Sequence, residues 1–207
     1  MPRQVDPIER RRQITSAAIN ILATGGASAL TLKSLAEELG GSITLVTHFF
    51  ASREDIFTAV VDDLAESYDS ELQALEAGAD AAGRLKILLE WMVPLSPQDV
   101  DQESGRIALI SQRHTHQGID HFFEVMENRV RGLLSSHLEP VVPERDVPQL
   151  VDYLRALTNG LALSAVEHPE IWTKERVLGV IHRSIEALGL EETAAELQGA
   201  GAASPAL

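Results

Sequence analysis

The feature that most constrains this chain is the spacing of its apolar residues. They recur every three or four positions in almost every segment, as in the series Ile14, Ala17, Ala18, Ile21 and Leu22. Such spacing gathers apolar side chains on one side of an α-helix, and no segment of useful length alternates apolar and polar residues as a half-buried strand does. The sequence therefore predicts an all-α fold of about nine helices.

Composition excludes several classes of protein. Cysteine is absent, so disulfides and Cys-ligated zinc are excluded. No apolar run approaches the ~20 residues of a membrane span, and residues 1–7 lack the apolar stretch of a secretion signal. We therefore expect a cytoplasmic protein with no membrane partner.

The net charge of −14 is unevenly distributed along the chain. Residues 1–60 carry six basic and six acidic side chains, whereas residues 61–207 carry 11 basic and 25 acidic ones. Proteins that bind nucleic acid along their whole surface neutralise phosphates with Lys and Arg, which this chain as a whole cannot do. The asymmetry instead predicts two parts with different functions.

Capping residues and breakers set the expected helix boundaries. The first helix should stop at Gly25-Gly26, and Pro94 and Pro97 should break the chain before a helix over about residues 102–117. Two long helices are expected over about residues 148–168 and 173–188.

The most informative pattern lies in residues 31–50. One short helix is expected between Thr31 as N-cap and Gly40-Gly41, and another from Ser42 as N-cap to about Phe50. Two helices of about eight residues joined by a tight turn have the dimensions of a helix-turn-helix, whose second helix lies in the DNA major groove. An ordinary helical hairpin with a solvated polar side is the alternative.

Polar residues on the second of these helices would contact base edges and phosphates. Hydroxyls and an imidazole suit that role, and Leu45 offers a methyl contact to thymine. Ile43 is also a candidate for the apolar side of this helix. The candidate DNA contacts in this segment are Ser42, Ile43, Thr44, Leu45, Thr47 and His48.

The segment Arg10 to Leu64 resembles the N-terminal domain of the TetR family of one-component transcriptional repressors. The matching residues follow that family's order: Ile14-Thr15-Ser16-Ala17-Ala18, Gly25-Gly26, Thr31-Leu32-Lys33-Ser34-Leu35-Ala36, Gly40-Gly41-Ser42 and Phe50-Ala51-Ser52-Arg53-Glu54-Asp55-Ile56. The resemblance covers about the first third of the chain. With the helix pattern, it predicts a helix-turn-helix DNA-binding domain over residues 1–50, a ligand-binding and dimerisation domain over 51–197, and a disordered tail over 198–207.

The resemblance also implies roles for individual residues. Arg53 resembles a phosphate anchor at a helix N-terminus, and Thr31 and Lys33 look like DNA backbone contacts. The cluster Arg10-Arg11-Arg12 would approach the flanking DNA or form a solvated face.

Three positions depart from the family's pattern. A small residue usually stands where this chain has Thr44, a Tyr where it has Thr47, and a His where it has Phe49. Thr47 would reach a phosphate less far than Tyr does. His48 would supply a contact that other members make differently.

One helix-turn-helix domain of this size makes few base contacts, so we expect two such domains to bind one palindromic operator. The last two predicted helices are apolar on more than one side and therefore need more than one packing partner. A twin subunit would supply one of them, although burial within one chain is the alternative. The resemblance likewise implies a homodimer through these helices. The candidate interface residues are Leu154, Leu157, Leu161, Ala165, Val177, Ile181 and Ile185.

The middle of the chain would form a pocket for a small-molecule effector. The candidate lining residues, each equally suited to an ordinary core, are Trp91, Met92, His114, Phe122 and Met126. His114, His116 and His121 raise the alternative of a helical metalloprotein or enzyme. No metal-ligand, nucleotide or nucleophile motif accompanies them, so we expect no cofactor, no metal ion and no catalysis.

These observations predict a DNA-binding transcriptional repressor whose operator binding as a homodimer is relieved by a small-molecule ligand. A protein-interaction module, in which the first three helices bind a partner protein, is the remaining alternative.

Overall fold

The computed structural model describes residues 7–113 and 117–191 of the 207-residue chain. Within these ranges it contains nine α-helices, one short 3₁₀ helix and no β-strand, which confirms the predicted all-α fold. The described residues form two compact units. Unit 1 lies within Met1–Asp69 and Gly105–Met126, and unit 2 lies within Ser70–Ser104 and Glu127–Leu207.

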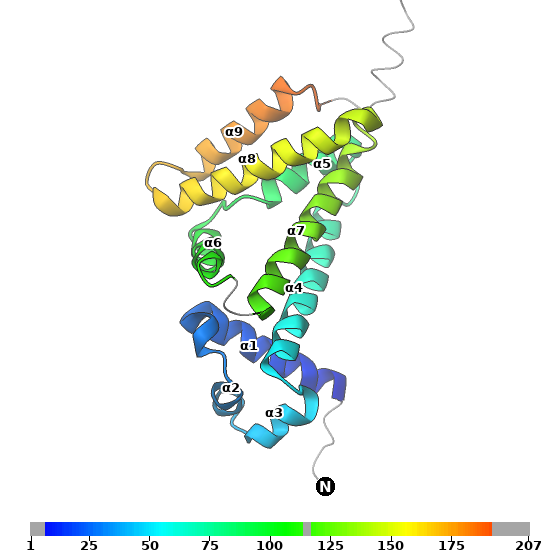
Figure 1. The fold of residues 1–207 in the computed structure, drawn as a ribbon. Helices are drawn as coiled ribbons and strands as arrows, with labels where there is room; N and C mark the ends of the chain where they lie inside the picture. The colour runs from blue at the N-terminus through cyan, green and yellow to red at the C-terminus, as the bar shows by residue number, and fades with distance from the viewer. Residues whose placement is uncertain (1–6, 114–116, 192–207) are drawn as a thin grey trace, which may run out of the picture. The chain divides into compact units, whose positions relative to one another are not determined.

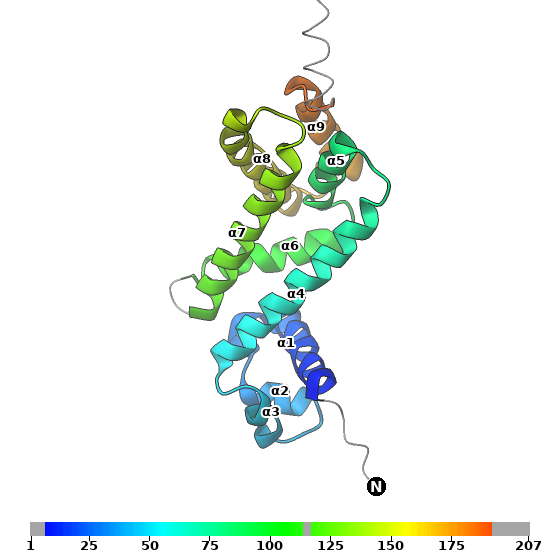
Figure 2. The same cartoon turned by 90° about the vertical axis from the view of Figure 1, so that its right-hand side faces the viewer.

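Figures 1 and 2 label the helices along the chain. Because α4, α6 and α7 cross the boundaries of the units, each contributes residues to both. The elements are α1 (Pro7–Ala29), α2 (Leu32–Glu38), α3 (Ile43–Phe49), α4 (Arg53–Leu75), α5 (Ala81–Trp91), α6 (Pro97–Ile110), α7 (Gln117–Leu138), η1 (Glu144–Asp146), α8 (Val147–Glu167) and α9 (Lys174–Ala187).

The predicted end of the first helix is wrong, because α1 continues through Gly25-Gly26 to Ala29. Each glycine in a helix interior costs about 1 kcal/mol relative to alanine. Tertiary contacts offset this cost: Leu30, directly after the helix, is fully buried. The Ser34 hydroxyl also donates a hydrogen bond of 2.7 Å to the terminal carbonyl of Ala29.

The predicted start of α6 is also wrong, because the helix begins at Pro97 rather than near residue 102. Pro97 occupies the first helical position, where its missing N–H removes no intrahelical hydrogen bond. Ser96 and Asp99 form a capping box around it. Ser96 Oγ accepts from the Asp99 N–H at 3.2 Å, and Asp99 Oδ2 accepts from the Ser96 N–H at 2.8 Å.

The core of unit 1 joins the first four helices to the start of α7. Its apolar side chains are at most 6% exposed and come from residues far apart in the sequence. They are Ile14, Ala17, Ala18, Leu30, Leu35, Ala36, Val46, Phe50, Ile56, Phe57, Ala59, Val60 and Ile119.

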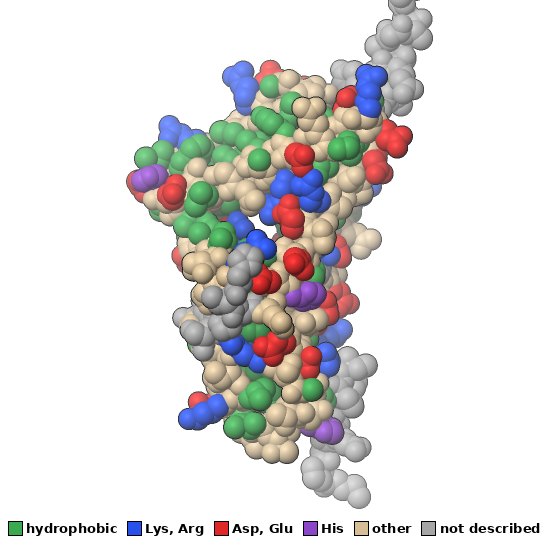
Figure 3. Space-filling model, viewed as in Figure 1, with side chains coloured by type: hydrophobic (Ala, Val, Ile, Leu, Met, Phe, Trp, Pro, Cys, Tyr) green, Lys and Arg blue, Asp and Glu red, His purple; other side chains and the backbone are tan. Residues whose placement is uncertain are grey.

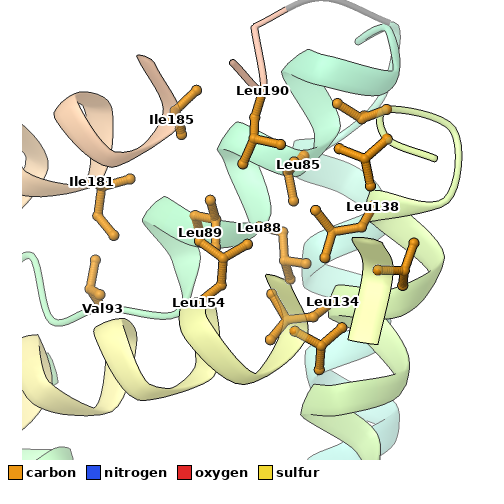
Figure 4. Close-up of a cluster of buried hydrophobic side chains, with 14 of the residues drawn as sticks. Leu85, Leu88, Leu89, Val93, Leu134, Leu138, Leu154, Ile181, Ile185 and Leu190 are labelled. Carbon is orange, nitrogen blue, oxygen red and sulfur yellow. The ribbon is translucent and has the colours of Figure 1, made fainter. Parts of the chain in front are cut away.

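The core of unit 2 packs α5, the C-terminal half of α7, α8 and α9 around leucine and isoleucine side chains (Figure 4). One buried polar pair accompanies it: His137 Nε2 lies 2.6 Å from Glu76 Oε1. His137 Nδ1 lies 2.7 Å from the Leu133 carbonyl, and Arg84 Nε donates to Glu76 at 3.1 Å. These buried polar groups are therefore satisfied within the unit.

Candidate nucleic-acid interface

A reciprocal capping box fixes the start of α2. The Thr31 hydroxyl accepts a hydrogen bond from the Ser34 N–H at 2.9 Å, and the Ser34 hydroxyl accepts one from the Thr31 N–H at 2.9 Å. Leu35 and Ala36 then face the core. The predicted helix start at Thr31 is confirmed.

The turn between α2 and α3 depends on Gly40. Its φ of 59° lies in the left-handed region, which most residues with a Cβ avoid. The Gly41 N–H bonds back to the Ala36 carbonyl at 2.9 Å, and Ser42 caps α3 by accepting from the Leu45 N–H at 3.3 Å. The chain thereby turns from α2 into α3 within a few residues, and the two helices pack against each other and α2 against α1 (Figures 1 and 2).

Helical spacing divides the seven residues of α3 into two sides. Val46 is fully buried, and Leu45 and Phe49 pack against the unit 1 core as partly buried side chains. Four residues occupy the other side and are exposed; we call them the α3 outer face. They are Ile43, Thr44, Thr47 and His48.

Two side chains of α3 lie differently from the sequence expectation. Ile43, a candidate for the apolar side, is 47% exposed. It is the first residue of the helix, and helical side chains tilt toward the N-terminus, so it projects beyond the core. Leu45, expected to face outward, is half-buried. The apolar contact offered by the outer face therefore comes from Ile43.

The flanking candidates lie at the starts of neighbouring helices. Lys33 pairs with Glu37 at 3.8 Å, but both side chains are more than two-thirds exposed, so the pair contributes little stability and leaves the amine accessible. Arg53 is the first residue of α4, with its guanidinium carbon 5.2 Å from the centre of the Phe57 ring.

The arginine cluster of α1 includes a contact that the sequence analysis missed. The Arg11 guanidinium lies 4.4 Å from the centre of the Phe50 ring and donates a hydrogen bond of 3.4 Å to the Phe49 carbonyl. It therefore ties α1 to the C-terminal end of α3. Arg10 instead bonds Gln13 at 3.0 Å. No local pattern indicates a contact between residues this far apart in the chain.

The candidate ligand residues are divided between the two units. Trp91 and Met92 pack half-buried against the core of unit 2, whereas Phe122 and Met126 are half-buried in unit 1. His114 lies outside the described residues, as does His116. A hollow of about 260 Å³ in unit 2 has none of the candidates among its lining, which is Asp80, Ala82, Gly83, Lys86, His182, Ile185, Leu190 and Glu191.

The candidate interface residues lie in the chain's own core. Apart from the partly buried Leu157, all are at most 6% exposed in a single copy and pack within unit 2; Figure 4 shows Leu154, Ile181 and Ile185 there. In a single copy only Leu157 among them keeps a partly exposed side chain. They are Leu154, Leu157, Leu161, Ala165, Val177, Ile181 and Ile185.

Among the residues that the structure describes, no group of three or more His, Asp or Glu side chains is arranged to hold a metal ion. None of the described helices is both long enough and apolar enough to cross a bilayer.

The geometry defines a class of protein: a helix-turn-helix DNA-binding protein with a separate helical unit. The model of the family "Bacterial regulatory proteins, tetR family" matches residues 14–60, and that of "BetI-type transcriptional repressor, C-terminal" matches residues 81–190. The second match spans more than half of the chain. The chain therefore belongs to the TetR family, and the protein is a DNA-binding transcriptional regulator with a BetI-type C-terminal region.

Individual relatives agree with this assignment. The HTH-type transcriptional regulator PksA of Bacillus subtilis is 28% identical in an alignment of 204 residues that covers 93% of this chain and 96% of PksA. BetI of Rhizobium meliloti is 22% identical over 158 residues, 76% of this chain and 77% of BetI.

Solved structures share the fold. A transcriptional regulator of Saccharomonospora viridis in complex with choline has a TM-score of 0.71 at 22% identity, covering 86% of this chain and 96% of that one. The multidrug binding protein EbrR complexed with imidazole has a TM-score of 0.60 at 22% identity, covering 88% and 93%.

Proposed function

We propose that the protein is a homodimeric repressor that binds a palindromic operator through the α3 outer face and releases it when a small molecule binds. The observation that carries the proposal is the side of α3 left exposed by core packing, where polar side chains and one isoleucine face outward. This face lies in the N-terminal part of the chain, whose net charge is close to zero. The rest of the chain is acidic and is therefore repelled by DNA.

The side chains suggest a division of roles on DNA. Thr44, Thr47 and His48 would bind base edges and phosphates, and Ile43 would contact a thymine methyl. Thr31, Lys33 and Arg53 would hold the phosphate backbone on either side. The Thr31 hydroxyl already accepts from the Ser34 N–H and donates to Ser34 Oγ at 3.0 Å, so its phosphate contact would require this donor to turn from Ser34 to the DNA.

Dimerisation through α8 and α9 remains our proposal, with a different set of residues from the buried candidates. The exposed side of α8 carries Tyr153, Ala156, Gly160 and Leu163, which we call the α8 outer face. The Tyr153 side chain is 47% exposed and the Leu163 side chain is 43% exposed, so the core of this copy does not cover them. Apolar side chains lie over α8 and α9 in Figure 3, as a surface covered by a second copy requires.

The remaining proposals concern the domains and the effector. We keep residues 1–50 as the DNA-binding domain and 51–197 as the domain that binds the effector and dimerises. The candidate effector contacts stay a prediction for each unit by itself: Trp91 and Met92 in unit 2, and Phe122 and Met126 in unit 1, with His114 outside the described residues. The two related structures that hold choline and imidazole support a small organic effector. We further propose that the protein acts in the cytoplasm, without catalysis.

A gel-shift assay on the DNA flanking the protein's own coding region tests this function. We expect a discrete complex whose affinity falls steeply with salt, because phosphate contacts release counterions. Absence of any salt-sensitive complex on that DNA, and on duplexes selected from a random pool, would reject the proposal.

A further inference from the structure

Gly118, near the start of α7, lies unusually close to Phe57 of α4. A Cβ placed on Gly118 would lie 2.8 Å from the Cβ, the Cγ and the Cδ2 of Phe57. These distances are well below the 3.5–4.0 Å of normal carbon contact. Both residues belong to unit 1, so this contact is internal to one compact unit.

Phe57 cannot yield easily to a larger neighbour. It is 5% exposed and belongs to the core cluster that also contains Ile119, the residue after Gly118. Two of the three close atoms are its Cβ and Cγ, which lie next to the backbone of α4. A side chain at position 118 would therefore push the start of α7 away from α4 or tilt the ring.

The same ring supports Arg53. The guanidinium carbon lies 5.2 Å from the ring centre, within the range of a cation–π contact. Arg53 precedes Phe57 by one turn of α4, so the position of the ring limits where the guanidinium can point. Gly118, Phe57 and Arg53 thus form a continuous series of contacts from α7 to the proposed phosphate anchor.

We propose that Gly118 is a positioning residue for operator binding: its missing side chain lets α7 seat on Phe57, which holds Arg53 toward the DNA phosphate. The proposal rests on the proposed function. It also deepens that function, because it names the contacts within unit 1 that set the direction of the phosphate anchor.

The test compares G118A with G132A, a substitution in the same helix at which an added Cβ meets nothing within 4 Å. The probe is a duplex selected from a random pool by the wild-type protein. We expect G118A to weaken binding about tenfold, the worth of one charge-assisted hydrogen bond, and to lower the salt slope by about one, as loss of one phosphate contact does. G132A should stay within about twofold.

A double-mutant cycle separates positioning from general loss of structure. If Gly118 acts through Arg53, R53Q should weaken the wild type about tenfold yet add little to G118A. F57L, which removes the ring without adding a clash, should also lower the salt slope by about one.

Three results would overturn the inference. They are a G118A that binds like G132A, G118A and R53Q effects that multiply, and a weaker G118A with an unchanged salt slope. A wild-type protein that selects no duplex at all would overturn the proposed function as well.

Discussion

The helices α3 and α8 present two contrasting surfaces. Core packing buries one side of α3 and leaves the α3 outer face mostly polar, with a single isoleucine. In α8 the core takes Val151, Leu154 and Leu161, yet Tyr153 and Leu163 remain exposed on the other side. In a short helix with one apolar side, the sequence alone therefore indicates which side binds a partner. In a long helix that is apolar on more than one side, it does not.

The strongest test of this contrast is Leu154→Ala. Because Leu154 is fully buried within a single copy, the substitution should lower the free energy of unfolding by about 2–5 kcal/mol. Urea unfolding at several protein concentrations measures it. A loss that appeared only at high protein concentration and vanished at low concentration would instead place Leu154 at a contact between copies.

The complementary substitution is Leu163→Asp on the α8 outer face. A charge at the centre of an apolar interface should weaken dimerisation by about 2–4 kcal/mol. Sedimentation of the two proteins measures the change. Ile110→Asp is the matched control, since Ile110 is 48% exposed but lies on α6, and it should leave the association unchanged. Equal behaviour of the two variants would rule out this interface.

On α3, Thr47→Ala should weaken operator binding by about 1 kcal/mol, the typical worth of one hydrogen bond. Thr58→Ala is a close control, because both hydroxyls are exposed and donate to a backbone carbonyl of their own helix, at 3.3 Å for Thr47 and 3.1 Å for Thr58. Fluorescence anisotropy on a labelled duplex compares them. If both variants bind as the wild type does, Thr47 does not contact DNA.

The smallest expected effect concerns the first turns of α9 and α2. Hydrogen bonds from its own backbone N–H and from Thr173 lower the pKa of Glu175 below its ordinary value of 4.5. A lowered pKa contributes stability that is present above pH 4.5 and lost as the pH falls through the folded-state value. The capping box of α2, Thr31 with Ser34, is uncharged and contributes no such pH dependence.

Urea midpoints at pH 6 and pH 3 test this difference. Glu175→Gln should destabilise the protein slightly at pH 6 and not at pH 3, whereas Thr31→Ala should cost about 1 kcal/mol at both. A loss of equal size at both pH values for Glu175→Gln would contradict the cause given for its lowered pKa.

Capping residues and apolar spacing predicted the helix-turn-helix well. The caps Thr31 and Ser42 and the buried Leu35, Ala36 and Val46 lie within twenty residues, where helical spacing is reliable. Local signals failed where tertiary contacts decide the outcome. Packing at Leu30 carries α1 through two glycines, and Pro97 begins a helix because Ser96 and Asp99 cap it.

The contacts that support the candidate site could not be predicted from spacing. Arg11 meets Phe50, and Gly118 meets Phe57, across long stretches of chain. Likewise, the many apolar positions of α8 and α9 indicate that each helix packs on two sides, but they do not indicate which side faces the chain's own core. Only the packed structure shows that Leu154 is buried and Leu163 is exposed.

The central claim is that two copies of the α3 outer face enter successive major grooves of one operator. Hydroxyl-radical footprinting of the wild-type protein on its selected duplex tests it most directly. The account predicts two protected patches related by a dyad, with their centres separated by whole helical turns of about 10 base pairs, and their loss when Thr44, Thr47 and His48 are all changed to alanine. A single asymmetric patch, or protection that survives the triple substitution, would contradict it.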